Sequence, residues 1–195
     1  MKKKNKSILF ISLTIIMFLF VVSGFFVSFI LKKQDQNMSN RDGLEVIFNS
    51  SQNIELKNIL PMSDDLGKKL NDQSVEKGGY GYLNFSVKNR SDKKIEYNIY
   101  IVKNDDSKNR INDKFIKFYL TDKNNNPVGD YNKNVVPTYL DLLSMSSLPA
   151  GRIVYSDVLD GNQEKSFILR SWVSDFYNMV EDEESFDFDV FVKSK

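Results

Sequence analysis

The feature that most constrains the fold of this chain is an alternation of apolar and polar residues with a period of two. In residues 82–89, for example, Leu83, Phe85 and Val87 alternate with asparagine, serine and lysine. Successive side chains of a β-strand point to opposite faces, so each such segment has one apolar face to bury. The pattern recurs from Leu44 to the C-terminus and predicts a chain built of half-buried strands.

Eight or nine short strands are predicted, separated by turn sequences and without a long amphipathic helix. Antiparallel sheets with one solvated face have this pattern. We therefore predict an all-β domain over residues 44–195, an antiparallel two-layer β-sandwich of the Ig-like or jelly-roll type. The segment Tyr139–Leu143 is compatible with either a short helix or a strand. The predicted strands are residues 44–48, 53–60, 82–89, 95–101, 116–120, 152–159, 164–173 and 185–192.

Two connections have distinctive turn sequences. Residues 152–159 and 164–173 are predicted to form a hairpin, because Asp160-Gly161 between them supplies the positive φ that such a turn needs. The run from Asp122 to Pro127 is rich in Asn and is predicted to be a second turn.

The N-terminal part of the chain has a different character. Residues 8–31 are a run of 24 residues without a charge, and a helix of that length measures about 36 Å, enough to cross a hydrocarbon core of about 30 Å. Four lysines precede this run and two follow it, a bias that places the N-terminus in the cytoplasm. We therefore predict a cytoplasmic basic tail (1–7), a single transmembrane helix (8–31), a stalk (32–43) and an extracellular domain (44–195) of a cell-membrane protein.

A cleaved signal peptide is the alternative interpretation of the N-terminus. Val22 and Gly24 have the small size that the −3 and −1 positions of a cleavage site require. The apolar sequence continues beyond that site as far as Leu31, however, and is longer than the apolar region of a signal peptide, about 7–15 residues. This length favours an uncleaved anchor.

The composition excludes several classes of chemistry. The chain has no Cys and no His, which excludes disulfides, thiolate zinc sites, Ser-His-Asp triads and imidazole bases. A formal net charge of +1 gives no electrostatic basis for binding nucleic acid. We therefore expect no enzyme activity, no catalytic or cofactor-binding residues, and no cofactor or metal; an enzyme built on Asp, Glu, Ser, Lys and Tyr alone is a third alternative.

Two acidic motifs invite comparison with calcium sites. Asp122, Asn124 and Asn126 have the spacing of the first half of an EF-hand loop, but Pro127 occupies the position that needs Gly and Lys133 the position that needs Glu. We interpret this motif as a turn. The second motif consists of Asp187, Asp189 and residues 181–184, which we interpret as a solvated strand face with an acidic loop.

Several aromatic residues are candidates for contacts with a ligand. The tyrosines Tyr80, Tyr82, Tyr97, Tyr100 and Tyr119 suit sugar or protein contacts, but they suit β-sheets equally well, and we favour the sheet. Trp172 and Arg170 are two residues apart and share one side of a strand. Arg170 stacked on the indole at the surface is one possibility, and a bulge that turns Trp172 into the core is the one we favour.

Two longer runs resemble a known family. YLNFSVKNRSDKKIEYNIYIVKN is similar to the "F-x-V-x-N-x-S, then Y-x-I" hairpin of small Ig-like surface domains of Gram-positive bacteria, and PAGRIVYSDVLDGNQEKSFILRSWV has a matching pattern. Residues 44–195 thus resemble the TasA/camelysin group of secreted matrix proteins. The resemblance implies a jelly-roll or Ig-like sandwich at the cell surface. The chain differs from the group in its retained anchor and in its lack of the imidazole ligands that zinc proteolysis needs, and no functional residue is carried over.

These features predict a membrane-anchored extracellular β-sandwich that acts as a cell-surface binding or structural module with a protein or cell-wall partner. The alternative is an accessory subunit of a membrane protein complex that interacts through its transmembrane helix.

Overall fold

The computed structural model describes residues 37–39, 43–75, 79–104, 111–129, 135–145, 148–178 and 184–195. The predicted basic tail, 1–7, and transmembrane helix, 8–31, lie outside the described residues. Within the part that is described, no helix is long and apolar enough to cross a membrane. Residues Met38–Lys195 form one compact unit.

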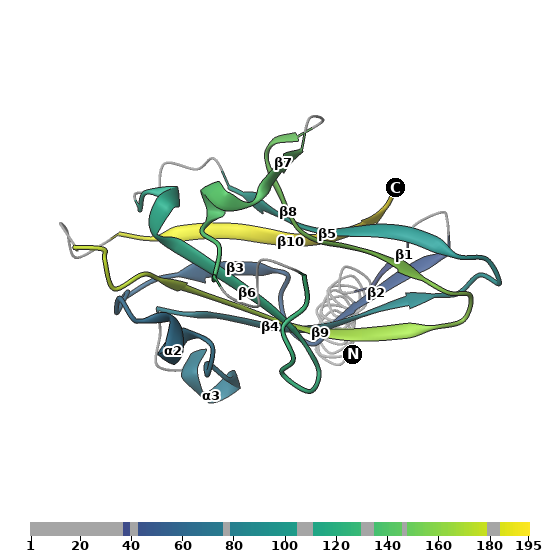
Figure 1. The fold of residues 1–195 in the computed structure, drawn as a ribbon, viewed down its shortest axis with the longest axis horizontal. Coiled ribbons are helices and arrows are strands. Elements are labelled where there is room, and N and C mark those ends of the chain that lie inside the picture. Colours follow the sequence, from purple (N-terminus) through teal and green to yellow (C-terminus); the bar gives the residue numbers. More distant parts are fainter. Residues whose placement is uncertain are drawn as a thin grey trace, which may run out of the picture. The chain divides into compact units, whose positions relative to one another are not determined.

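This unit is a sandwich of two five-stranded sheets, as predicted (Figure 1). All neighbouring strands of the second sheet pair antiparallel, and so do the β2–β4, β4–β9 and β9–β6 neighbours of the first sheet. The first sheet has the order β1 (Asn37–Ser39), β2 (Leu44–Phe48), β4 (Gly81–Asn89), β9 (Glu164–Val173) and β6 (Ile116–Asp122). The second sheet has the order β3 (Asn53–Leu56), β10 (Phe186–Ser194), β5 (Ile95–Lys103), β8 (Leu148–Leu159) and β7 (Leu143–Met145).

Short helices lie between the strands. In the described ranges, two are α-helical and two are 3₁₀ turns: α2 (Asp64–Gly67), α3 (Asp72–Val75), η1 (Asp113–Phe115) and η2 (Tyr139–Asp141).

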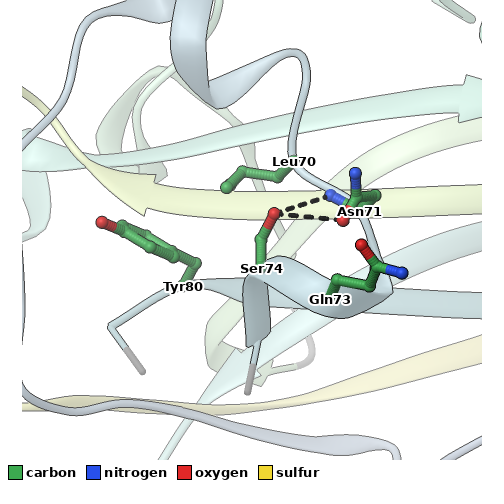
Figure 2. A pocket seen from close by; sticks show the side chains of 5 residues that line it. All are labelled: Leu70, Asn71, Gln73, Ser74 and Tyr80. Carbon is green, nitrogen blue, oxygen red and sulfur yellow. Dashed lines mark hydrogen bonds between the residues drawn. The ribbon is translucent and has the colours of Figure 1, made fainter. Parts of the chain in front are cut away.

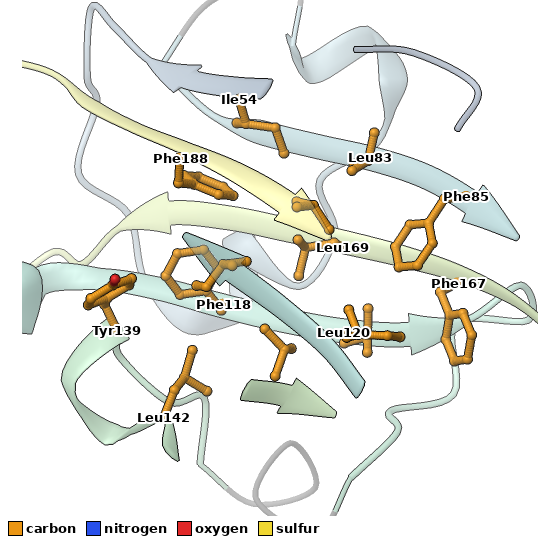
Figure 3. Packing of buried hydrophobic residues seen from close by; sticks show 14 of the residues in the cluster. Ile54, Leu83, Phe85, Phe118, Leu120, Tyr139, Leu142, Phe167, Leu169 and Phe188 are labelled. Carbon is orange, nitrogen blue, oxygen red and sulfur yellow. The ribbon is translucent and has the colours of Figure 1, made fainter. Parts of the chain in front are cut away.

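The predicted alternation accounts for the core between the sheets. Buried and partly buried residues alternate along the whole of β4 and along β10 from Phe186 to Val192. In β10 the buried side chains are Phe186, Phe188, Val190 and Val192, which confirms the predicted core face of this strand. Phe188 packs edge-on against Phe118 of β6, with 5.1 Å between the ring centroids, so the two sheets meet through aromatic rings (Figure 3).

The predicted hairpin between residues 152–159 and 164–173 is wrong. Strands β8 and β9 belong to different sheets, and the same holds for β4 and β5, which the family resemblance paired as a hairpin. The positive φ in the β8–β9 turn belongs to Asn162, at 59°, and not to Gly161. Both connections cross from one sheet to the other.

The β4–β5 and β8–β9 connections pack against each other, and this contact explains why Asn89 and Gly161 occupy their positions. The Asn89 side-chain amide donates hydrogen bonds to the carbonyls of Leu159 and Asp160, both at 3.1 Å. A β-carbon at Gly161 would lie 2.4 Å from the carbonyl oxygen of Asp92. Gly161 is therefore required for close approach of the two turns and not for its φ.

Several boundaries also differ from the prediction. Strand β1 lies inside the range 32–43 that we predicted as a stalk, and β3 ends at Leu56 instead of Leu60. The ambiguous segment Tyr139–Leu143 contains the 3₁₀ turn η2 followed by the first residue of β7. A reciprocal capping box between Thr138 and Asp141 fixes this turn.

Replacing Phe188 by alanine tests the aromatic contact between the sheets. Phe188 is fully buried, so Phe188→Ala should lower the free energy of unfolding by about 3–5 kcal/mol through lost transfer energy and a cavity. Val158→Ala, at a position 44% exposed in the second sheet, should change it by less than about 0.5 kcal/mol. Urea unfolding measures both values, and equal small losses would show that β10 is not packed as described.

Candidate binding site

The outer face of the first sheet carries a second layer. Residues 62–75, here called the covering segment, include α2, which lies against strand β9, and α3, which lies against strand β4. Met62 fixes the start of this segment beside the end of β9, because its N–H donates to the carbonyl of Val173 at 2.9 Å and its carbonyl accepts from Asp175 at 3.1 Å. A separate apolar cluster forms between the segment and the sheet; its buried members are Leu70, Tyr119, Val136 and Trp172.

Trp172 is buried under this segment. It is fully buried, as favoured from the sequence, but it lies on the outer face without a bulge, since the registers Lys117↔Trp172 and Tyr119↔Arg170 are continuous. The covering segment approaches the indole at Gly67, where a β-carbon would lie 2.2 Å from Cε2 of the ring. Glycine at the end of α2 therefore permits the close packing of this layer.

Arg170 is the most unusual side chain of the layer, because it is a guanidinium only 4% exposed. Its Nε donates to the carbonyl of Leu70 at 2.7 Å, and its Nη atoms donate to Oγ1 of Thr121 at 3.0 Å and to Oδ1 of Asn125 at 2.5 Å. It does not stack on Trp172 in the way considered from the sequence; it lies over the ring of Tyr82, 5.5 Å from the centroid.

All the groups that hold Arg170 are neutral. Among the described residues, no carboxylate forms an ion pair with the guanidinium. Burial lowers the pKa of Arg170, but a guanidinium stays protonated at any pH a folded protein meets. Within the described part of the chain, a full positive charge is therefore buried without a counter-charge, an arrangement that costs several kcal/mol unless other interactions offset it.

A pocket of about 240 Å³ opens at Leu70, the residue whose carbonyl accepts from Arg170. It is lined by Leu70, whose carbonyl Arg170 binds, and by Asn71, Gln73, Ser74 and Tyr80 (Figure 2). Ser74 Oγ accepts from the backbone N–H of Asn71 at 3.2 Å and donates to Asn71 Oδ1 at 3.3 Å. Burial raises the pKa of Tyr80, so its phenol is a neutral hydrogen-bond donor at physiological pH. The pocket thus offers neutral polar groups next to a buried cation.

The EF-hand-like motif forms a turn, as predicted. The carboxylate of Asp122 accepts from the backbone amides of Asn124 at 2.8 Å and Asn126 at 2.9 Å. Its oxygens are thus used within the turn, which also holds Asn125 at φ 64° so that the Asn125 side chain reaches Arg170. Lys133 lies outside the described residues.

The acidic strand face is organised by an amide. Nδ2 of Asn53 on β3 donates to Asp187 at 2.7 Å and to Asp189 at 3.1 Å, bridging the two carboxylates of β10. Among the residues that the structure describes, no group of three or more Asp or Glu is placed to hold a metal ion; residues 181–183 lie outside them.

The tyrosines fall into two groups. Tyr97 is fully buried, and Tyr100 stacks on Phe191 with 5.5 Å between centroids, so both serve sheet packing. Tyr82 and Tyr119, by contrast, lie opposite Arg170 in the register of the first sheet and flank it on both sides. The period-two pattern of the sequence predicts that Arg170 and Trp172 share one face of a strand, which is correct, but it does not indicate the segment that covers that face.

Replacing Gly67 by alanine tests the packing of the covering segment. The added methyl has no room beside the indole, so Gly67→Ala should lower the free energy of unfolding by about 1–3 kcal/mol although alanine favours helix. Leu66→Ala, at a position 59% exposed in the same helix, should change it by less than about 0.5 kcal/mol. Urea unfolding followed by Trp172 fluorescence measures both, and a more stable Gly67→Ala would contradict the contact.

Two carboxylates make the stability dependent on pH. The hydrogen bond from the Asn126 side chain holds the pKa of Asp122 below its ordinary value, and the backbone hydrogen bond from Thr138 does the same for Asp141. Both stabilise the fold above their unfolded pKa of about 3.9, and this stabilisation is lost as the pH falls through the lower folded pKa.

Thermal unfolding midpoints should therefore decrease from about pH 5 downward. The decrease should be smaller in Asp122→Asn and Asp141→Asn than in Asp65→Asn, a matched change at an exposed position of α2. The same slope in all three variants would contradict the role of these two carboxylates.

Comparison with known proteins gives no relative for this chain: no family model, no curated protein and no solved structure matches it. The functional assignment therefore depends on the sequence pattern and on the geometry described above.

Proposed function

We propose that this chain is a single-pass membrane protein whose extracellular β-sandwich, of the Ig-like or jelly-roll type, acts as a cell-surface binding or structural module. The observation that carries the proposal is the order of its parts. A 24-residue run without a charge, preceded by lysines, is followed shortly by a compact unit that begins at Met38 and has its own core. A segment of this length is suited to anchoring, and a sandwich of this size is suited to folding outside the membrane.

The character of the pocket favours binding as the role of the sandwich. Its polar groups are amides, a hydroxyl and a phenol, which orient a ligand by hydrogen bonds. The proposed location is the surface of a Gram-positive bacterium, as the TasA/camelysin resemblance of the sequence implies, although its two hairpins do not form; the crossing connections between the sheets are compatible with the jelly-roll alternative.

Exposed apolar side chains favour a protein as the partner. Leu60, Leu66 and Phe176 are 60%, 59% and 84% exposed. Leu60 and Phe176 each lie two residues along the chain from the point where Met62 pairs with Ser174, and Leu66 lies in the helix that follows Met62. Apolar side chains exposed near one another are typical of interaction surfaces. The alternative function, an accessory subunit of a membrane complex, places the contact within residues 8–31 instead.

The absence of cysteine from the sequence makes the topology directly testable. A single cysteine introduced as Lys94→Cys, at a side chain 75% exposed in the sandwich, should react with a membrane-impermeant maleimide on intact cells. Lys3→Cys, the matched control in the basic tail, should react only after the cells are permeabilised.

The reverse labelling pattern would contradict the proposed orientation. Loss of the Lys3→Cys label from the mature chain, together with release of the sandwich into the medium, would show that the signal-peptide interpretation is correct.

A further inference from the structure

We propose that the pocket beside Leu70 binds a small oxyanion, such as a carboxylate or phosphate group, and that the buried charge of Arg170 selects for it. The inference deepens the proposed function, because it rests on the sandwich being a binding module and names the chemistry of its ligand. Two observations support it: Arg170 has no ion-pair partner among the described residues, and a series of hydrogen bonds leads from the guanidinium to the pocket.

The acids of the covering segment do not neutralise Arg170. The segment contains three acids, Asp64, Asp65 and Asp72, and two lysines, Lys68 and Lys69, and Asp64 lies 3.9 Å from another lysine, Lys117 of β6. The guanidinium has no ion-pair partner among the carboxylates that the structure describes, and it lies where the low dielectric weakens its screening.

A hydrogen-bond chain links this charge to the pocket. Arg170 Nε donates to the carbonyl of Leu70 at 2.7 Å. The N–H of the same peptide group belongs to Asn71, points the opposite way, and donates to Ser74 Oγ at 3.2 Å; Ser74 in turn donates to Asn71 Oδ1 at 3.3 Å (Figure 2). Every donor in the chain points away from the cation, so each bond polarises the next in the same sense.

The series of hydrogen bonds ends at side chains that can donate hydrogen bonds to an anion. Within the described part of the chain, three donors of the residues that line the pocket have no protein acceptor: Asn71 Nδ2, the Gln73 amide and the Tyr80 hydroxyl. An oxyanion accepts several hydrogen bonds at once, and bonds from neutral donors to a charged group are stronger than those to a neutral one. A cationic ligand would instead be repelled by the buried charge of Arg170.

The test measures binding of sodium acetate and of inorganic phosphate to the full chain in detergent micelles, with ionic strength held constant by sodium chloride. Trp172 is the only tryptophan and packs in the same cluster as Leu70 and Tyr80, so its fluorescence reports on the pocket. We expect a saturable change with at least one of the two anions, and calorimetry should give the same Kd. Saturation by acetate alone assigns the site to carboxylates, and saturation by both assigns it to oxyanions in general.

Variants connect the binding to the pocket. Tyr80→Phe removes one donor and should weaken the Kd about tenfold, the effect of losing one hydrogen bond to a charged group. Tyr100→Phe, the matched change in the second sheet, should leave it unchanged. Arg170→Gln should abolish binding; where that variant fails to fold, Gln73→Ala, at an exposed position, replaces it as the second test and should also weaken the Kd.

No saturable change with either anion, or wild-type Kd values in both Tyr80→Phe and Gln73→Ala, would overturn the proposal. Neither result bears on the membrane topology, which the maleimide labelling decides separately, so failure of the ligand class and failure of the proposed function are distinguishable.

Discussion

Burial of β9 on both faces is the constraint on which the rest of the described structure depends. From Phe167 to Val173 every residue of this strand is buried. Its inner side chains, Phe167 and Leu169, belong to the core between the sheets, whereas its outer side chains, Arg170 and Trp172, need a cover of their own. The covering segment supplies it, and the pocket exists at the edge of that cover.

The β-sandwich was predictable because alternation with a period of two is a local property of the sequence. Each of the predicted strands has a counterpart in the structure, and the face assigned to β10 is correct. The partners of the strands were not predictable to the same extent. A turn such as residues 160–163 has the same composition whether the chain returns within a sheet or crosses to the other, and only long-range packing, here of Asn89 against Leu159, distinguishes the two.

In the candidate site, too, the local pattern was predictable from the sequence and the long-range contacts were not. Sequence spacing placed Arg170 and Trp172 on one face of a strand, which is correct. It did not indicate what covers them, because residues 61–75 have no regular period and include only four-residue helices. Gly67 was the one available indication, and its meaning depends on the position of an indole more than 100 residues away in the chain. The link from the guanidinium through Leu70 to Ser74 likewise joins parts of the chain that no local pattern connects.

The position of β10 has a consequence for how the protein reaches its folded state. Strand β10 follows all the other described strands in the sequence, yet it lies between β3 and β5 and not at an edge. Among the strands that the structure describes, β3 pairs within its sheet with β10 alone, so β3 has no partner there until a strand far later in the sequence is in place. Pairings between such distant segments form slowly, and until β10 docks the apolar faces of β3 and β5 are exposed to aggregation or to chaperones. A chain shortened by this one strand would lose the middle of a sheet and not merely its border.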